Sequence, residues 1–512
     1  MEVKRALLSC SDKTRLPDFS KTLAKLGVQI VSTGGTAKFL KDNGVTVEEV
    51  SSLTGFEEIL DGRVKTLHPK IHGGLLALRE NKRHMAEISK HGIKPIDMVV
   101  VNLYPFAEAI RKKGATLEDA LEQIDIGGST LIRAAAKNFK DVAVVVDPGS
   151  YGMIASELEK NGGSLEHETL RNLAVRAFDY SSSYDAAIYA YLSKSASIFP
   201  GILTLKFKKL YDLRYGENPY QSAAFYSDLM AAGSSIPNAR QLHGKQPSYN
   251  NILDINDALE VAADFSDPTA TVLKHMNPCG VASSDSLDEA YSLAHDSDPI
   301  SAYGCIVSFN RKVDLKTVDR MKGHFIEAIV APGFDEDALQ KLRERKNIRL
   351  LEVPIERSNP GMLDLKRVRS GLLVQTSGKA AVSSKGLKVV SSRKPSEDEI
   401  RSLLFAWKVN CHVTSNSIVL SKDTHTVGVG AGQMSRVDAV KIAVEKAGSK
   451  AEGSMMASDA FFPFRDGIDE AAKGGVTAVI QPGGSIRDAE VIDAVNEHRM
   501  AMVFTGVRCF KH

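Results

Sequence analysis

Cysteine is scarce in this sequence, and its placement excludes several classes of protein. Only five cysteines occur in 512 residues, and no two of them form a C-x-x-C pair. A zinc ribbon needs such pairs, and a disulfide scaffold needs more cysteines in a shorter chain. The pattern therefore argues against both and favours a reducing cytoplasm. The five are Cys10, Cys279, Cys305, Cys411 and Cys509.

A strong net charge and long apolar runs are missing as well. Lys plus Arg number 65 and Asp plus Glu number 63, so no overall field favours nucleic acid or an acidic membrane. No run of ~18 apolar residues occurs, so we expect no transmembrane helix. The N-terminus has Glu2 and no apolar segment typical of a secretory signal. We expect a cytoplasmic protein that binds neither nucleic acid nor membrane.

The length of the chain predicts two or more domains. Short apolar strands alternate with helices up to residue ~195, which predicts a parallel sheet with helices on both faces. The pattern breaks at 198–201, so we expect an α/β domain at 1–199 and a larger α/β domain at 200–512. The expected strands of the first domain are 6–8, 29–31, 98–103 and 142–146, and its last helix spans about 166–192.

The second domain is long enough for two similar subdomains, although the sequence shows no tandem repeat. A new strand is expected to open it at 203–205. Its other expected strands are 271–274, 305–309, 417–420, 478–480 and 501–504. The last of these suggests that the C-terminus is tied down.

The most informative motif is a glycine turn at the start of an alanine-rich helix, in residues 124–138. Gly127 and Gly128 free the backbone to expose its N–H groups, and a helix N-terminus favours an anion or a developing oxyanion. Asp125 stands at this mouth, and Arg133 and Lys137 share one helix face. The motif indicates a site. The alternative is a glycine turn with a solvated surface helix.

Upstream motifs support the site. Residues 62–74 gather Arg, Lys and His ahead of a glycine pair, a composition that suits a phosphate and a polar heterocycle. A buried-strand pattern ends at Asn102 and Tyr104, and ligands bind at strand ends in α/β sheets. Loops beginning at Ser11 and Ser32 each follow a strand and precede a helix, which also suits phosphate.

A second constellation lies in the C-terminal half. Arg214 beside Tyr215 offers a phosphate fork and a stacking ring. Farther on, a strand delivers Lys274 and His275 into an Asn-Pro-Cys-Gly turn. Histidine exchanges protons near neutral pH, but neighbouring strand residues serve one pocket only at a strand end or bulge. The alternative is a solvated Lys and a His satisfied by backbone, and the strand–turn context favours a functional pair.

The same stretch separates this chain from the zinc deaminases. Those enzymes use H-x-E with P-C-x-x-C. Here Asn277 stands at the place of the Glu, and no second Cys follows Cys279. The metal ligands are missing, so we expect no metal.

Two further segments bear on cofactors. Residues 427–436 read as strand, glycine turn and helix, with G-x-G-x-G in place of the dinucleotide G-x-G-x-x-G, and no P-loop occurs. Neither a nicotinamide nor ATP is implied. Residues 457–466 place three Phe around a Pro and end in Arg465 and Asp466, which suits a flat pterin ring.

With these motifs, the whole chain resembles the bacterial family of bifunctional purine biosynthesis enzymes that join AICAR formyltransferase to IMP cyclohydrolase (AICAR is 5-aminoimidazole-4-carboxamide ribonucleotide). The resemblance implies a methylglyoxal-synthase-like N-terminal domain and two cytidine-deaminase-like subdomains in the C-terminal domain. It implies 10-formyltetrahydrofolate as co-substrate, small-molecule nucleotide and folate ligands, and a homodimer with formyltransferase sites built across the interface.

The resemblance also implies roles for individual residues. His275 would be the general base on the 5-amino group of AICAR, and Lys274 would stabilise charge or assist proton transfer to folate. Phe464 and Asp466 would hold the folate. Ring closure would fall to Lys65, Tyr104, Asp125 and Lys137. The nucleotide would be bound by Ser11, Lys13, Ser32, Gly34, Gly35, Thr36, Lys65, Thr66, Ile126 and Gly127 in one half, and by Arg214, Tyr215, Asn251, Asn416, Phe461 and Arg508 in the other.

Three positions depart from the family pattern, and two alternative functions stay open. Cys305 stands where some members have an acidic residue, Lys511 replaces a His, and Ser129 receives only a capping role.

One alternative function is that of a monofunctional cyclohydrolase or methylglyoxal-synthase-like enzyme with an inactive C-terminal domain. The other is a nucleotide-binding protein without turnover. Two candidate proton-transfer sets argue against both.

Overall fold

The computed structural model describes residues 1–110, 112, 114–193, 198–228, 235–356, 361–378 and 381–512. The chain divides into two compact units, Met1–Lys206 and Phe207–His512. The Lys206 ammonium donates to the Asp179 carbonyl and the Ser182 hydroxyl, so the chain stays attached to helix α10 (His167–Leu192) up to this residue. Within the described ranges, no helix is both long and apolar enough to cross a membrane.

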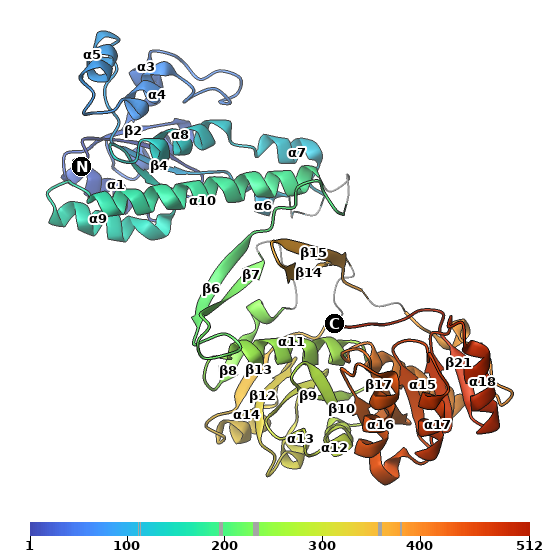
Figure 1. Ribbon diagram of the computed structural model, residues 1–512. Coiled ribbons are helices and arrows are strands. Elements are labelled where there is room, and N and C mark those ends of the chain that lie inside the picture. The colour runs from blue at the N-terminus through green and yellow to red at the C-terminus, as the bar shows by residue number, and fades with distance from the viewer. Residues whose placement is uncertain (111, 113, 194–197, 229–234, 357–360, 379–380) are drawn as a thin grey trace. The chain divides into compact units, whose positions relative to one another are not determined.

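The N-terminal unit is built on a five-stranded sheet of order β3-β2-β1-β4-β5, and every neighbouring pair is parallel (Figure 1). The predicted parallel sheet and its four apolar strands are confirmed. Strand β3 carries two glutamates and gave no apolar signal. The strands are β1 (Arg5–Cys10), β2 (Gln29–Ser32), β3 (Glu48–Glu49), β4 (Met98–Asn102) and β5 (Ala143–Val145).

Two buried clusters lie on opposite faces of this sheet, because alternate strand residues point to opposite sides. Met98 and Val100 of β4 join one cluster, and Val99 and Val101 join the other. The first face is covered mainly by α1, α2 and α9, and the second by α4, α8 and α10. The helices are α1 (Leu16–Lys25), α2 (Gly34–Asp42), α3 (Val50–Thr54), α4 (Pro69–Leu76), α5 (Lys82–Lys90), α6 (Phe106–Ala109), α7 (Leu117–Glu122), α8 (Ile126–Lys137), α9 (Tyr151–Lys160) and α10.

The C-terminal unit is built on one sheet of twelve strands, ordered β16-β21-β20-β19-β17-β18-β10-β9-β11-β12-β13-β8. A mixed α/β region is therefore confirmed. The strands are β8 (Arg240–His243), β9 (Thr269–Lys274), β10 (Asn277–Ser283), β11 (Cys305–Phe309), β12 (Ile326–Ala331), β13 (Arg349–Glu352), β16 (Lys388–Val389), β17 (Ile418–Lys422), β18 (His425–Gly430), β19 (Met455–Ser458), β20 (Ala478–Gln481) and β21 (Ala501–Phe504).

The order of these strands is a repeat that the sequence did not reveal. From the centre outward, one half reads β10-β9-β11-β12-β13-β8 and the other β18-β17-β19-β20-β21-β16. Each half has an antiparallel hairpin, an antiparallel third strand, two parallel additions and an antiparallel edge strand. Similar topology requires a similar apolar pattern and not similar residues, so no tandem repeat is visible in the sequence.

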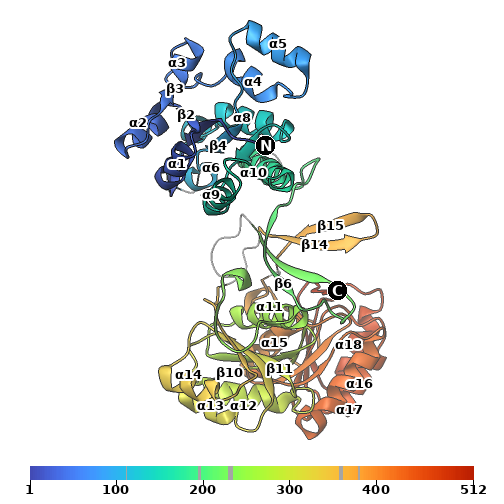
Figure 2. The ribbon, with the colours of Figure 1, turned by 90° about the vertical axis from the view of Figure 1, so that its left-hand side faces the viewer.

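The helices repeat with the strands. Helix α11 packs on one face of the first half, and α12, α13 and α14 pack on the other; α15 and the set α16–α18 take the same places in the second half (Figure 2). The bounds are α11 (Tyr249–Ala263), α12 (Leu287–Ser297), α13 (Leu315–Arg320), α14 (Glu336–Arg343), α15 (Glu397–Asn410), α16 (Arg436–Ala447), α17 (Asp466–Lys473) and α18 (Asp488–Glu497).

One glycine in each half lets a helix approach the sheet closely. A Cβ built on Gly280 would lie 2.0 Å from the Ala294 carbonyl oxygen of α12, and one on Gly428 would lie 2.2 Å from that of Ala443 in α16. Backbone atoms cannot retreat as a flexible side chain can. The predicted glycine turn near 430 is therefore, at Gly428, a packing requirement inside a strand.

Two small antiparallel sheets complete the unit, and one corrects a prediction. Strand β6 (Phe207–Leu213) pairs with β7 (Ala223–Asp228), and β14 (Leu363–Val368) pairs with β15 (Gly371–Thr376). The strand predicted at 203–205 is wrong, because these residues belong to no strand and β6 begins only at Phe207, which pairs with Asp228, the last residue of β7.

Candidate active sites

The N-terminal site lies at the carboxyl ends of parallel strands, where loops from several strands meet. Ser11 and Lys13 follow β1, the first turn of α2 with Gly34, Gly35 and Thr36 follows β2, and Tyr104 follows β4. Hydrogen bonds join these loops directly: the Asp12 N–H donates to Asn102 Oδ1 over 2.7 Å. Except for Lys137, the predicted cyclohydrolase residues gather at this edge.

Several predicted nucleotide ligands already serve the fold. The Ser32 hydroxyl donates to the Leu8 carbonyl over 2.7 Å, and the Thr36 hydroxyl bonds both the N–H and the carbonyl of Cys10 at 3.1 Å. Both residues are buried. Gly34 and Gly35 are exposed, although the Glu58 carboxylate lies beside Gly34, so the backbone at the start of α2 offers more to a ligand than the hydroxyls do.

Asp125 begins helix α8 and holds the glycine turn in place. Its Oδ1 accepts the Gly128 N–H over 2.7 Å, and its own N–H donates to the Tyr184 hydroxyl over 2.9 Å. Burial raises the pKa of Asp125, while the Gly128 N–H and the nearby Lys65 act against that rise. A carboxyl group with a raised pKa next to a helix N-terminus is suited to exchange protons.

Both glycines of this turn are needed because of crowding, although the sequence suggested backbone freedom. A Cβ on Gly128 would lie 2.6 Å from both Asp125 Oδ2 and Leu103 Cδ2, and one on Gly127 would lie 2.8 Å from Thr66 Oγ1. Neither glycine has a positive φ. The absence of side chains brings the 62–66 loop against the first turn of α8.

Thr66 is a buried residue with an unused hydroxyl. Among the described residues, its Oγ1 has no hydrogen-bond partner, and the side chain faces Gly127 at the helix N-terminus. A buried hydroxyl without a partner is costly, and a ligand oxygen at the N-terminus of α8 would satisfy it. This observation independently supports a polar ligand at the predicted position.

Other cations of the 62–74 segment are already paired. Arg63 forms an ion pair with Glu122, and the Lys70 ammonium donates to the Thr54 carbonyl over 2.9 Å. Lys65 remains beside Asp125. Lys137 is the last residue of α8, twelve positions after Asp125, which corresponds to about 18 Å along a helix. One chain therefore does not bring Lys137 together with Asp125.

The C-terminal constellation centres on the two-residue turn between β9 and β10. Both turn residues have left-handed backbones, with φ of 51° at His275 and 61° at Met276. A type I′ hairpin turn requires this conformation, which Asn-Gly adopts easily and other residues at about 1–3 kcal/mol each. Because Lys274 ends the strand and His275 lies in the turn, their side chains need not point to opposite faces of the sheet.

Polar groups on every side hold this turn. Asp254 of α11 accepts the N–H of His275 over 3.2 Å and that of Met276 over 2.8 Å, and burial raises the pKa of Asp254. The Asn277 amide donates to the His275 carbonyl over 3.1 Å, and the Lys274 ammonium donates to the Tyr303 carbonyl over 2.7 Å. The imidazole of His275 is left exposed.

Strand directions place this turn at the same end of the sheet as the carboxyl ends of the second half. Strands β10 and β18 are antiparallel, so the start of β10 lies beside the end of β18. Contacts agree: the Thr414 N–H donates to Asn277 Oδ1 over 2.9 Å, two residues before Asn416. Elements from both halves therefore meet at one end.

A cavity of about 730 Å³ opens at this end. It is lined by residues that follow β18, β19, β20 and β21, together with Asn416 just before β17, and the lining includes five of the predicted ligands. They are Asn416, Phe461, Phe464, Asp466 and Arg508. Phe462, from the same Phe-rich segment, is instead buried in the core. Lys274 and His275 are not among the residues that line the cavity.

Arg436 organises the floor of this cavity and was not predicted. It is buried, pairs with the buried Asp459, and donates to Asn416 Oδ1 over 2.7 Å. The Asn416 amide in turn donates to the Gln433 carbonyl over 2.9 Å. Arg436 is the first residue of α16, four positions after the last glycine of the G-x-G-x-G segment, and that position was the signal available in the sequence.

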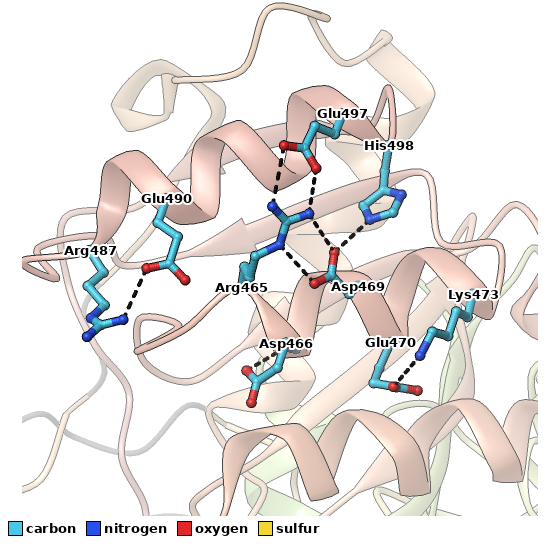
Figure 3. Close-up of polar contacts among 10 residues, drawn as sticks. Arg465, Asp466, Asp469, Glu470, Lys473, Arg487, Glu490, Glu497 and His498 are labelled. Carbon is cyan, nitrogen blue, oxygen red and sulfur yellow. Dashed lines mark hydrogen bonds and ion pairs between the residues drawn. The ribbon is translucent and has the colours of Figure 1, made fainter.

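A charged network fixes the start of α17, where the predicted folate ligands lie. Arg465 pairs with Asp469 and with Glu497, and His498 pairs with Asp469 over 2.8 Å (Figure 3). Hydrogen bonding to Arg465 lowers the pKa of Asp469 to about 2. Figure 3 shows Asp466 pointing away from this network, and that side chain lines the cavity.

The remaining predicted residues take separate places. Arg214 follows β6, is exposed, and lies over the Tyr215 ring with 5.4 Å between guanidinium carbon and ring centroid. Asn251 is buried in a capping box at the start of α11 and donates to Glu327 over 2.7 Å, so its amide serves the fold. Cys305 lies in the apolar core, where burial raises its thiol pKa to about 12. Only 1% of Cys305 is exposed, so its thiol is not accessible at this position, where some family members have an acidic residue.

Sequence reasoning also missed positioning groups of both sites. Tyr184 supports Asp125, and Asp254 supports the His275 turn. The signal for Tyr184 was its spacing of four from Tyr180, which bonds the Leu103 N–H from the same helix face. The described part of the chain contains no group of three or more His, Cys, Asp or Glu placed to hold a metal ion.

Comparisons with known proteins identify the family to which the chain belongs. A model of the AICARFT/IMPCHase bienzyme family matches residues 135–446, and a model of the MGS-like domain matches 15–130. The bifunctional purine biosynthesis proteins PurH of Bacillus cereus and Bacillus anthracis are each 51% identical to the chain over 510 residues, covering 99% of this chain and 100% of theirs. A solved structure titled "Crystal structure of ForH" is 36% identical and covers 38% of this chain and 99% of its own, with a TM-score of 0.36. The chain belongs to the AICARFT/IMPCHase bienzyme family, with an MGS-like N-terminal domain.

Proposed function

We propose that the two units divide the two reactions of the family between them. Membership makes the chain an AICAR formyltransferase and an IMP cyclohydrolase, which catalyse the last two steps of IMP synthesis. The C-terminal unit transfers a formyl group from 10-formyltetrahydrofolate to the 5-amino group of AICAR. The N-terminal unit then closes the ring with loss of water. Domains 1–199 and 200–512 carry these roles.

Formyl transfer needs a base because the 5-amino lone pair is delocalised into the imidazole carboxamide. His275 accepts a proton from the amine as nitrogen bonds to the formyl carbon. The bond from that carbon to folate N10 then breaks, and N10 takes a proton, with Lys274 as the nearby cation. The exposed imidazole in a left-handed turn held by Asp254 is the observation that carries this assignment.

The cavity at the same sheet end supports the ligand assignments. Asn416, Phe461 and Arg508 bind the nucleotide, and Phe464 with Asp466 binds the folate. Arg214 and Tyr215 reach the nucleotide from β6, and Asn251 supports the site from α11. Aromatic walls with a carboxylate suit a pterin, and an Arg suits a phosphate.

A homodimer with formyltransferase sites across its interface fits the cavity rim. Lys274 and His275 do not line the cavity of their own chain, although they lie at its end of the sheet. Met434, Ile486 and Phe510 are exposed nearby. A second copy would cover these apolar groups and bring a Lys-His turn to the cavity.

Ring closure uses the N-terminal edge. The carboxamide nitrogen attacks the new formyl carbon, and negative charge develops on the formyl oxygen. The N–H groups at Ile126 and Gly127, with Lys65, stabilise that charge. Asp125 and Tyr104 handle the protons before water leaves, and Ser11, Lys13, Ser32, the 34–36 turn and Thr66 hold the nucleotide. Lys137 keeps its predicted catalytic role only through contacts beyond its own chain.

The finer fold assignment and the location belong to the same proposal. The repeated halves of the C-terminal sheet are cytidine-deaminase-like subdomains, supported by their common order of one hairpin and three further core strands. A cytoplasmic location is supported by the five free thiols.

The test is a coupled assay with matched variants. The protein is incubated with AICAR and 10-formyltetrahydrofolate, and tetrahydrofolate and IMP are followed together. We expect both products, with His275→Ala blocking only formyl transfer and Asp125→Asn slowing only the cyclisation of supplied formyl-AICAR. Accumulation of formyl-AICAR would remove the N-terminal assignment, and loss of both activities in each folded variant would remove the division of labour.

A further inference from the structure

The His275 turn is held from the carbonyl side by the C-terminal segment. The Lys511 ammonium donates to Asp257 Oδ2 over 2.6 Å, to the His412 carbonyl over 3.2 Å and to the Met276 carbonyl over 3.4 Å. An ammonium has three N–H donors, and this one has an acceptor for each. Lys511 therefore joins α11, the segment before β17 and the turn itself.

The position of Lys511 is fixed by its own backbone. Its N–H donates to the Ser415 hydroxyl over 3.1 Å, and its carbonyl accepts the Ser415 N–H over 2.9 Å. Its side chain is about one-quarter exposed and that of Asp257 is nearly buried. The last residues of the chain are thus docked, and the ammonium is not a solvated surface charge.

Asp254 and Lys511 bind different backbone groups of the turn, one its N–H groups and the other a carbonyl. Asp254 accepts the two N–H groups, and Lys511 donates to the carbonyl of Met276. Asp254 and Asp257 are three apart on α11, so one helix face supplies both the direct acceptor and the anchor for Lys511. A left-handed His-Met turn persists only where its surroundings hold it, and these groups do so.

We propose that Lys511 is a positioning residue for His275. It acts through the Met276 carbonyl and Asp257, and it fixes the direction in which the imidazole meets the amine. The inference rests on the proposed role of His275 in formyl transfer. Lys511 is not among the residues that line the cavity, so its loss should lower kcat and leave AICAR binding largely intact.

The experiment compares Lys511→Met with Lys511→Arg in the full-length protein. Met keeps the length and removes the donors, and Arg restores a cation that can reach carbonyls and a carboxylate. The matched control is Lys366→Met, because Lys366 donates to the His512 carbonyl from β14 and leaves the turn untouched. Formyl transfer and cyclisation of supplied formyl-AICAR are measured separately, with kcat and KM for each.

We expect Lys511→Met to lower the formyl-transfer kcat by about 10- to 100-fold with KM for AICAR within about threefold of wild type, since small misplacements of a catalytic group are costly. Lys511→Arg should recover most of the loss, and cyclisation and Lys366→Met should match wild type. An unchanged kcat, a rise in KM alone, or a loss that Arg does not recover would overturn the proposal. If Lys511→Met does not fold, Asp257→Asn replaces it, with the same expectation.

Failure of the proposed function looks different. If wild type transfers formyl groups and His275→Ala is equally active, the role of His275 is wrong and the inference falls with it. If His275→Ala is inactive and Lys511→Met is fully active, only the inference is wrong.

Discussion

The two halves of the C-terminal sheet have the same strand order, but they carry different residues at the same turn. Lys274 ends β9 and Lys422 ends β17, and each is followed by a left-handed residue, His275 in one half and Asp423 in the other. Each hairpin contains an irregularity before a glycine that a helix crowds, Gly280 or Gly428. The framework is therefore common to both halves, and the acid–base group is not.

The surroundings of the two turns differ in the same way. Asp254 and Lys511 hold the His275 turn and leave its imidazole exposed. The second turn is used for sheet cohesion, because the Thr424 hydroxyl donates to the Ser283 carbonyl over 2.7 Å. Since β10 and β18 are antiparallel, the two turns lie at opposite ends of the sheet. A repeated fold thus supplies two equivalent positions, and the proposed function uses only one of them for chemistry.

The largest expected effect comes from removing the side chain at the equivalent position of each turn. His275→Ala should lower formyl transfer by about 10²- to 10⁴-fold, because general bases contribute on that scale. Asp423→Ala, at the equivalent position, should leave the rate within about twofold, as expected of a surface substitution. Steady-state assays of both variants decide this, and equal losses in the two would mean that the turns are not functionally distinct.

The shared framework should respond equally in both halves. Gly280→Ala and Gly428→Ala each force a Cβ onto a helix carbonyl, so each should cost about 1–3 kcal/mol or more of unfolding free energy. Gly386→Ala is the control, because no atom lies within 4 Å of the added Cβ. Urea unfolding gives the values. A large cost at only one of the two glycines would contradict their equivalence.

The equivalent helices α13 and α17 begin differently, and this predicts a smaller contrast. Asp314 caps α13 by accepting the Thr317 N–H over 2.8 Å, so Asp314→Ala should cost about 1 kcal/mol without changing KM. Arg465, the residue just before α17, makes no capping hydrogen bond and is instead held by ion pairs with Asp469 and Glu497. In the sequence it lies between Phe464 and Asp466, the two predicted folate ligands. Arg465→Met should raise KM for the formyl donor about threefold, as loss of ground-state binding does. An unchanged KM would mean that this network does not contribute to binding of the formyl donor.

The smallest expected effect is on acid stability. The pKa of Asp469 is lowered to about 2 in the folded protein, below its ordinary value of 3.8. Its contribution is therefore present above about pH 4 and is lost as the pH falls through about 2. Because the Asp469 side chain is 30% exposed and solvent screens its ion pairs, Asp469→Asn should cost less than about 1 kcal/mol at pH 6 and close to nothing below about pH 2. A difference that grows toward low pH would have the wrong sign.

Apolar strands were predictable because local sequence determines them, but the roles of the glycines were not, since Gly428 lies inside a strand and Gly127 and Gly128 are required by crowding. The parallel order of the N-terminal sheet followed from strand–helix alternation. The capping role predicted for Ser129 is wrong, because Asp125 caps α8 by accepting the Gly128 N–H and Ser129 lies inside the helix. The strand predicted at 203–205 was misplaced, because the start of β6 at Phe207 depends on its register with β7 and not on apolar residues alone. The repeat was invisible because it lies in strand order and in one glycine per half.

Candidate sites were predictable as residue types and less so as geometry. The cavity gathers Asn416, Phe461 and Arg508 as one set, because carboxyl ends of neighbouring strands meet. The exposed side of a residue was not predictable, so Ser32 and Asn251 proved to be engaged by the fold. Support from remote segments, such as Lys511 reaching the turn, required the tertiary structure.

A crystal structure of the protein with AICAR bound would test the placement of chemistry at one end of the sheet most directly. We predict that the 5-amino group lies within about 3 Å of a His275 imidazole, from the same or a partner chain, with the phosphate in the cavity that Arg508 lines. Binding of AICAR beside the Asp423 turn, with no His275 near the amine, would contradict it.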